Sequence, residues 1–359
     1  MTPRDILYRR LANQQIARPK YRTPREMVAW LGAMQAQDYL GALWAIDLRL
    51  PNVAEADVEQ AIANRTIVRT WPLRGTLHFV AAVDIRWMLE LLAPRVIASG
   101  RRRLQQLELD DRTIARIRTL FVRALQGGKQ LTRDEMYALL ESARISSAGQ
   151  RGYHILWRLA HEGTICCGAR KGKQPTFTLI DEWVPNAKSL KRDEALAELT
   201  RRYFTGHGPA TLQDFVWWSG LKVSDAMAGL DMVTSTLIKE TDSKNTYWMS
   251  PITLASLDVP AKAYLLPGFD EYMLGYKDRT AALDRRHAEK IAPENNGRFM
   301  STMIFNGRVV GTWKRVLNQR AVVLTMEPFT ALKKAERQAF AAAAERYGEF
   351  IGRPVIVSG

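Results

Sequence analysis

Two glutamines near the N-terminus stand at a spacing that suits polar recognition or the positioning of a water molecule. Gln35 and Gln37 flank Ala36 and precede Asp38, between two stretches with helical periodicity. Residues two apart on a helix point about 200° away from each other, so the two amides can aim at one point only where the backbone leaves the helix. A carboxamide does not titrate near neutral pH, so neither glutamine can act as a strong acid or base. The competing interpretation is that both side chains are solvated or cap backbone groups.

Capping residues predict the helices that must position this pair. Thr23 and Glu26 have the spacing of a capping box, with Pro24 at the first helical position. After the pair, Asp38 precedes an apolar helical stripe over residues 40–48, which predicts that Asp38 is an N-cap. Asp38 is also the rival catalyst, because a carboxylate can act as a base where an amide cannot. We favour the N-cap.

Charge is the clearest compositional signal. The chain has 359 residues, of which 52 are Lys or Arg and 37 are Asp or Glu, giving a net charge of +15. Hydrophobic residues make up 47%, which indicates a globular chain rather than a disordered one. The excess of positive charge favours a polyanionic partner, most simply nucleic acid.

Several classes of protein are not supported by the sequence. No run of about 18 apolar residues occurs, so we expect neither a membrane-spanning segment nor a membrane partner. Cys166 and Cys167 are adjacent, which is neither a disulfide framework nor metal-ligand spacing and fits a reducing cytoplasm. The stretch Gly168–Lys173 does not match a phosphate-binding loop, and the histidines show no ligand spacing. We therefore expect a cytoplasmic protein that uses no metal and no cofactor.

A threonine followed three residues later by an acid and then an apolar residue recurs along the chain. The copies begin at Thr23, Thr132 and Thr211; the first two carry the Glu of a capping box and the third carries Asp. Each copy starts a short helix, followed by a second helical stretch and by alternating apolar residues around a turn. The predicted hairpins cover residues 67–80, 164–180 and 236–249. This order of elements is typical of a winged helix-turn-helix unit.

The character of the chain changes after about residue 250, where strand patterns predominate. Asn306–Gly307 is the strongest short hairpin signal in the chain. Strands are predicted at 264–266, 300–305, 308–313 and 316–326, and an amphipathic helix at 331–351. We predict an α+β fold in which three tandem winged helix-turn-helix units precede a β-rich C-terminal module with a closing helix. A barrel is one possible form of that module.

The same patterns predict a division of the chain into five segments. Two of them are not winged-helix units: a basic helical connector and the C-terminal β-module with its terminal helix. In chain order the segments are 1–84 with the glutamine pair, the connector 85–127, the second unit 128–190, the third unit 191–252 and the module 253–359.

Polar side chains of the first predicted hairpin are candidates for nucleic-acid contact. With the side-chain period of two in a strand, Arg74, Thr76 and His78 are expected to share a face. They are candidates for contact with phosphate or sugar. For His78 a structural hydrogen bond is an equally open alternative.

The second predicted hairpin has a basic tip. Arg170, Lys171 and Lys173 lie between its two strand patterns. We expect these side chains to contact phosphates, which position a protein on a duplex without reading its sequence. The alternative for each of them is a solvated charge.

A pair of acids, Asp270–Glu271, stands out in this basic protein. A catalytic role is one interpretation of the pair. We favour a structural role as the partner of Lys277 or Arg279. These two cations are further candidates for contact with DNA.

Four blocks of sequence together resemble one known family. They are Met34–Asp38, Leu73–His78, Leu266–Arg279 and Gly307–Trp313. In this order, and over nearly the whole chain, they are similar to the AlkZ/YcaQ-type DNA glycosylases. The resemblance implies tandem winged helices and a C-terminal β-module. It also implies excision of N7-alkylated purines from double-stranded DNA and, in some members, the unhooking of interstrand crosslinks.

The resemblance also implies which residues are catalytic. AlkZ-like members carry Gln–apolar–Gln and YcaQ-like members carry Gln–apolar–Asp, so Gln35–Ala36–Gln37 resembles the AlkZ side. Ala36 is smaller than the residue expected at the apolar position. A cationic N7-alkylpurine is already a good leaving group, so an amide that holds a water molecule near C1′ can suffice. We expect Gln37 to hold that water and Gln35 to orient the water, the sugar or Gln37.

We therefore predict a monofunctional DNA glycosylase, active as a monomer in base-excision repair. No Lys stands beside the glutamine pair for Schiff-base chemistry, so we expect no lyase activity. The main alternative is a winged-helix DNA-binding regulator without catalysis. Such a regulator typically dimerises on a palindromic site, whereas unequal units in one chain better suit a single lesion.

Overall fold

The computed structural model describes residues 1–242, 245–251, 262–293 and 297–358. The chain forms two compact units, of which the second is inserted in the sequence between parts of the first. Unit 1 is Met1–Val58, Ala197–Trp218 and Lys222–Gly359, and unit 2 is Glu59–Leu196 and Ser219–Leu221. The five predicted segments are a finer division and stay a prediction. Their last boundary, 252/253, lies outside the described residues.

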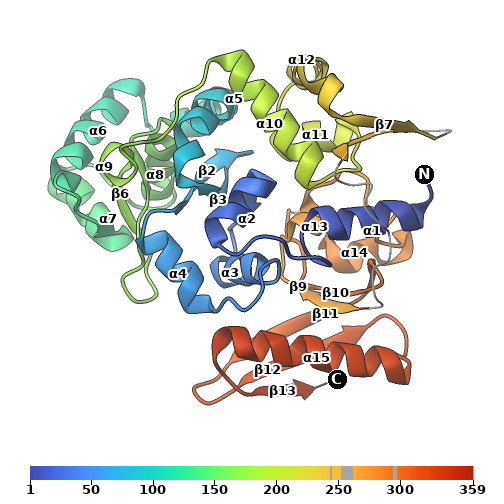
Figure 1. The fold of residues 1–359 in the computed structure, drawn as a ribbon. Helices are drawn as coiled ribbons and strands as arrows, with labels where there is room; N and C mark the ends of the chain where they lie inside the picture. The colour runs from blue at the N-terminus through green and yellow to red at the C-terminus, as the bar shows by residue number, and fades with distance from the viewer. Residues whose placement is uncertain (243–244, 252–261, 294–296, 359) are drawn as a thin grey trace. The chain divides into compact units, whose positions relative to one another are not determined.

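Unit 1 begins with helices and ends with a sheet (Figure 1). Its N-terminal elements are α1 (Pro3–Asn13), α2 (Pro24–Leu31), β1 (Ala33–Gln35), α3 (Tyr39–Asp47) and the start of α4 (Glu55–Ala63). Its middle elements are α10 (Arg192–Gly206) from Ala197 on, α11 (Leu212–Ser219) up to Trp218, α12 (Val223–Val233), η2 (Thr234–Thr236), β7 (Ile238–Thr241) and β8 (Thr246–Met249). Its C-terminal helices are α13 (Glu271–Leu274), η4 (Arg285–His287), α14 (Ala288–Ile291) and α15 (Lys334–Ile351).

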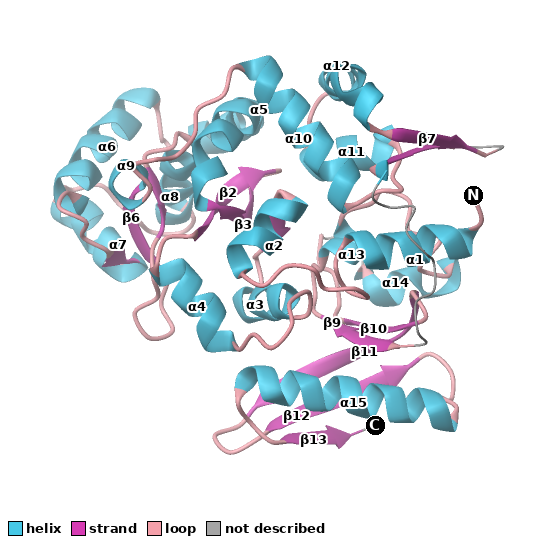
Figure 2. Cartoon of the chain, viewed as in Figure 1, coloured by secondary structure: helices cyan, strands magenta, loops and turns pink. Residues whose placement is uncertain are grey.

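The C-terminal sheet of unit 1 is open rather than closed into a barrel. Its strands are β9 (Ala263–Leu266), β10 (Thr302–Phe305), β11 (Arg308–Leu317), β12 (Val322–Pro328) and β13 (Val355–Ser358). They lie in the order β13-β12-β11-β10-β9, so within the described residues β13 and β9 are unclosed edges. The barrel form is therefore wrong. α15 connects β12 to the parallel strand β13 and lies along the sheet (Figures 1 and 2).

Local turn chemistry explains the hairpin of this sheet. Asn306 and Gly307 have φ values of 49° and 80°, and Phe305 pairs with Arg308, as a two-residue turn requires. The predicted hairpin is thus confirmed. The single strand predicted over 316–326 is wrong, because the chain turns between β11 and β12 and pairs Leu317 with Val322.

Aromatic side chains of α3 and α15 pack around the sheet. The Trp44 ring of α3 meets the Tyr347 ring edge-on, with their centroids 5.0 Å apart. Its indole N–H donates to the Leu265 carbonyl at 2.7 Å. The Trp313 ring of β11 packs on the same tyrosine ring, with their centroids 5.3 Å apart, and its indole N–H donates to the Leu266 carbonyl at 2.8 Å. These indoles are buried yet hydrogen-bonded, as buried polar groups must be.

Unit 2 is helical with a small antiparallel sheet. Its helices are the end of α4, η1 (Ala82–Asp84), α5 (Ile85–Gln106), α6 (Asp111–Leu125), α7 (Arg133–Ser142), α8 (Arg151–His161) and α9 (Ile180–Trp183). Its strands are β2 (Ile67–Leu73), β3 (Thr76–Ala81), β4 (Leu131–Thr132), β5 (Ile165–Cys167) and β6 (Thr176–Leu179), in the order β3-β2-β5-β6-β4.

The predicted helices and hairpins are present in the expected chain order. α7–α8 precedes β5–β6, and α11–α12 precedes β7–β8, whose turn includes residues outside the described ranges. The capping boxes at Thr23 and Thr132 are confirmed, and Thr211 exchanges hydrogen bonds with Asp214 as expected. The fold is thus mixed α/β. The assignment of three winged-helix units stays a prediction.

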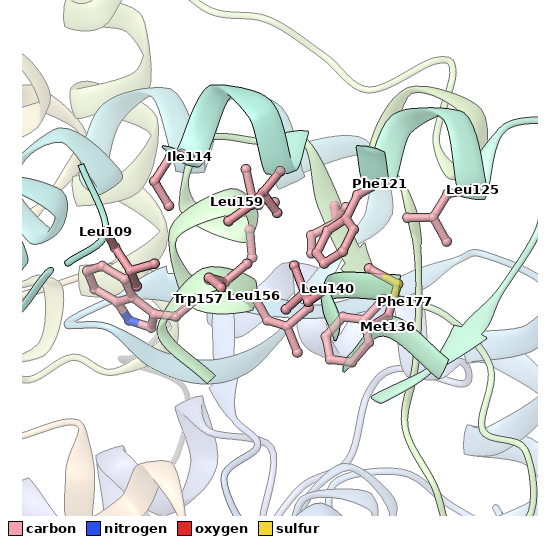
Figure 3. Close-up of a cluster of buried hydrophobic side chains, with 14 of the residues drawn as sticks. Leu109, Ile114, Phe121, Leu125, Met136, Leu140, Leu156, Trp157, Leu159 and Phe177 are labelled. Atoms are coloured by element: carbon pink, nitrogen blue, oxygen red, sulfur yellow. The ribbon is translucent and has the colours of Figure 1, made fainter. Parts of the chain in front are cut away.

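The core of unit 2 joins α6, α7 and α8 to the hairpin β5–β6 (Figure 3). Phe121 of α6, Leu140 of α7 and Leu159 of α8 are fully buried in one cluster. Phe177 of β6 packs in the same cluster, so the helices and the hairpin share a single apolar core.

Leu140→Ala is expected to destabilise unit 2 by about 2–5 kcal/mol, because the shortened side chain leaves a cavity. Native-state hydrogen exchange of peptides from α6 to α8 measures this loss within unit 2. Leu139→Ala, at the neighbouring half-buried position, is the matched control and should cost less. Equal losses in the two variants would contradict the packing described.

Candidate active site

The glutamine pair lies where the backbone breaks between α2 and α3. Gly32, with φ of 82°, ends α2, and the short strand β1 carries the chain from Ala33 to Gln35. Asp38 then accepts from the Gly41 N–H at 3.2 Å and caps α3. The helix break and the N-cap predicted from the sequence are both confirmed. A Cβ at position 41 would lie 2.5 Å from the Asp38 carboxylate, so the capping geometry needs glycine there.

The two amides of the pair have different surroundings. Gln35 is 8% exposed, and its Oε1 accepts the backbone N–H of Gln37 at 2.9 Å. Gln37 is exposed, whereas Ala36 between them is fully buried. The side chain of Gln35 therefore restrains the backbone of Gln37. The Gln37 side chain belongs to an exposed residue, where an amide can orient water.

Glu271 lies behind this strand. It is 1% exposed, and its Oε1 accepts the backbone N–H of Gln35 at 2.9 Å. Its other oxygen, Oε2, lies 2.9 Å from the Trp218 indole nitrogen and 3.4 Å from His207 Nε2. The carboxylate thus joins β1 to two aromatic residues from α11 and the end of α10.

Asp270 has a different partner from the one predicted. Its two oxygens accept from Arg49 Nη2 at 2.7 Å and Nη1 at 2.8 Å, and both side chains are fully buried. Asp270 also accepts from the Tyr272 N–H and caps α13. The expectation that Lys277 or Arg279 pairs with Asp270 is therefore wrong. No local signal points to Arg49, which is 221 residues away in the sequence.

Asp38 has a second contact that sequence reasoning missed. Arg315 Nη2 lies 3.0 and 3.1 Å from its two oxygens. Asp38 thus caps a helix and also pairs with a guanidinium. Its rival role as a catalyst stays a hypothesis.

Buried tyrosines border the Glu271 site. Burial raises the pKa of Tyr203 and of Tyr276 well above the usual value for a phenol. Tyr203 donates to the Gly275 carbonyl at 2.6 Å, and Tyr276 donates to the His207 carbonyl at 2.7 Å. Both phenols remain neutral near pH 7, so they act as fixed hydrogen-bond donors.

The first hairpin lies in unit 2 and differs in detail from its prediction. Arg74 and Gly75 form its turn, with φ values of 52° and 73°, so the strand period of two does not extend to Arg74. Thr76 begins β3 and is half-buried. His78 is fully buried, and its Nδ1 lies 2.9 Å from the Thr76 carbonyl oxygen. The structural hydrogen bond left open for His78 is present, and the DNA contacts stay predictions.

The second hairpin, also in unit 2, has two exposed cations and one half-buried one at its tip. Lys171 and Lys173 are exposed beyond β5 and β6. Arg170 is half-buried, donates to the Lys173 carbonyl at 3.0 Å and lies 3.5 Å from Glu59. Arg170 thus has a role in shaping the loop. The phosphate contacts of all three residues stay predictions.

The cations after α13 lie in unit 1. Lys277 is exposed, and its backbone N–H is held by Asp214 at 2.9 Å. Arg279 donates to the Met273 carbonyl at 2.6 Å, and its guanidinium lies over the rings of Trp217 and Phe299. Their roles in binding DNA also stay predictions.

In the described part of the chain, no helix has the length and apolarity needed to cross a membrane. In the same ranges, no group of three or more His, Cys, Asp or Glu is placed to hold a metal ion.

Comparisons with known proteins agree with this fold. Residues 28–350 match the family model described as "DNA glycosylase AlkZ-like". A curated relative, the "Interstrand DNA cross-link repair glycosylase" of Streptomyces sahachiroi, is 27% identical over 323 residues, covering 83% of each chain. The solved structure of Streptomyces sahachiroi DNA glycosylase AlkZ is similar over the whole of both chains, with a TM-score of 0.79 and 23% identity.

The mixed α/β fold and the family match together define a DNA glycosylase. The chain belongs to the AlkZ-like DNA glycosylase family.

Asp270→Ala is expected to lower the free energy of unfolding by about 3–5 kcal/mol, because Arg49 is left as an unpaired buried charge. Urea denaturation followed by circular dichroism measures the change. Asp284→Ala is the control, since the Asp284 pair with Arg286 is solvent-exposed and its loss should change stability little. Wild-type stability in the Asp270 variant would contradict a structural role for this ion pair.

Proposed function

We propose that this enzyme is a monofunctional glycosylase that hydrolyses the N-glycosidic bond of cationic N7-alkylated purines in double-stranded DNA. The observation that carries the proposal is the hydrogen bond from the Gln37 N–H to the Gln35 amide oxygen at 2.9 Å. It restrains the backbone of Gln37, an exposed residue. The enzyme acts as a monomer.

The chemistry needs no acid. The cationic base takes the electron pair of the glycosidic bond and leaves as a neutral molecule, while the sugar becomes an oxocarbenium ion. The Gln37 carbonyl holds a water molecule near C1′, and its dipole favours the positive charge that develops there. Water adds to C1′ and releases its proton to solvent, since an amide does not accept it. Gln35 acts by positioning Gln37.

Interstrand crosslinks are a natural extension of the substrate range. A crosslink formed through purine N7 carries the same cationic leaving group as a simple adduct. The name of the Streptomyces sahachiroi relative, an interstrand cross-link repair glycosylase, supports this extension.

Binding of the duplex is assigned to the basic side chains of both units. The exposed Lys171, Lys173 and Lys277 are the cations best placed for phosphates. Arg74, Thr76, His78, Arg170 and Arg279 complete the proposed set. We further infer that the three helix, helix and hairpin segments are winged-helix units, which is a common way to bind a duplex.

The wild-type enzyme is expected to release 7-methylguanine from duplex DNA and to leave 8-oxoguanine, an uncharged lesion, intact. Gln37→Ala should slow release by roughly 10²-fold or more, the size of effect seen when one stabilising dipole is lost. Single-turnover base release measures the rate. Gln338→Ala, an exposed glutamine on α15, is the matched control and should keep the wild-type rate. A full rate in the Gln37 variant removes that residue from the mechanism.

The product strand should stay intact until alkali is added, because a hydrolytic enzyme forms no Schiff base with the abasic sugar. Gel analysis of the same reaction, with and without alkali, tests this. Covalent trapping of enzyme on abasic DNA by borohydride would show lyase chemistry and contradict the assignment.

A further inference from the structure

Glu271 is a buried carboxylate whose two oxygens serve different parts of unit 1. On one side Oε1 accepts the Gln35 N–H at 2.9 Å. On the other side Oε2 accepts the Trp218 indole N–H at 2.9 Å and faces His207 Nε2 at 3.4 Å. Burying a charged carboxylate is costly unless hydrogen bonds compensate it, and donors on both sides meet that requirement.

The aromatic side of this contact is rigid. The His207 ring stacks on Tyr203 with centroids 4.7 Å apart and planes 15° apart, and it lies 5.2 Å from the Trp218 ring. All three residues are fully buried. The position of Oε2 is therefore set by packed rings, and the carboxylate transmits that position to β1.

The contacts continue from Glu271 to the exposed glutamine. Glu271 fixes the Gln35 backbone, the Gln35 side chain fixes the Gln37 backbone, and Gln37 presents its amide at the surface. β1 has three residues, and the last of them, Gln35, is the one whose N–H Glu271 accepts. An error in the placement of Glu271 would thus move both amides.

We propose that Glu271 is a positioning residue of the glycosylase reaction: it anchors β1, which ends at Gln35, to the packed Trp218 and His207 rings. This assignment rests on the proposed function. Glu271 acts through Gln35 and touches neither the base nor the sugar.

The need for a carboxylate, rather than an amide, follows from the count of acceptors. A carboxylate offers an acceptor oxygen on each side, whereas the side chain of Gln offers one oxygen and one NH₂. In Glu271→Gln, whichever way the amide is turned, its NH₂ faces either the Gln35 N–H or the Trp218 indole N–H. The variant therefore keeps the size of the side chain and loses one of its two anchors.

Glu271→Gln is expected to slow single-turnover release of 7-methylguanine by roughly 10²-fold, the effect of a displacement of about 1 Å in a reacting group. Its dissociation constant for the lesion duplex should stay at the wild-type value, because the phosphate contacts are unchanged. A wild-type rate per folded molecule overturns the assignment. If this variant does not fold, Trp218→Phe removes one donor to Oε2, keeps a ring there and should also lower the rate without loss of affinity. A wild-type rate in that variant equally overturns it.

Asp84→Asn is the matched control, because Asp84 is also a buried carboxylate that accepts a Trp indole N–H, that of Trp87 at 2.9 Å. It lies in unit 2 and should lose thermal stability while keeping the wild-type rate per folded molecule. An equal fall in rate in this control would reduce Glu271 to a structural residue. The wild-type enzyme separates the two proposals: absence of 7-methylguanine release defeats the proposed function before any variant is compared.

Discussion

Unit 1 depends on the burial of two adjacent carboxylates, Asp270 and Glu271. Charges in a protein interior must find partners, and these two find them in the N-terminal part of the chain, at Arg49 and at the backbone of Gln35. The partners are 221 and 236 residues away in the sequence. One dipeptide at the start of α13 therefore fixes both the end of α3 and Gln35, the last residue of β1.

In the proposed reaction a neutral side chain serves a hydrolytic site, and this arrangement supports its backbone. An amide contributes only a dipole, and a dipole is effective only when its direction is fixed in advance. The Gln35 side chain restrains the backbone of Gln37, and the Glu271 carboxylate restrains the backbone of Gln35. The restraining groups are buried, whereas Gln37 is an exposed residue.

Local sequence signals predict the helix caps and turns of this fold, whereas contacts between residues far apart in the sequence are not predicted. The capping boxes, the Asp38 cap, the break at the glutamine pair and the Asn306–Gly307 turn each depend on a few neighbouring residues, and all are present. The partner of Asp270 was missed because spacing in the sequence carries no information on a contact 221 residues away. The site roles and the winged-helix assignment remain predictions.

The barrel prediction for the C-terminal module is wrong for the same reason. Whether a sheet closes depends on how its first and last strands meet, which no single strand pattern encodes. β13 follows a helix and pairs in parallel with β12, so β13 forms an edge of the sheet. The single strand predicted over 316–326 spans three polar residues, 318–320, and the chain turns there, with the Asn318 N–H bonded to the Ala321 carbonyl.

Ala36 links the glutamine pair to the packing of the interior. Its methyl group is fully enclosed, so a larger apolar residue there would have to displace its neighbours and, with them, the amides on either side. A lineage that enlarges this position can keep an active enzyme only by shrinking something packed against it. Substitutions at Ala36 and at the core residues packed against it are therefore expected to occur together.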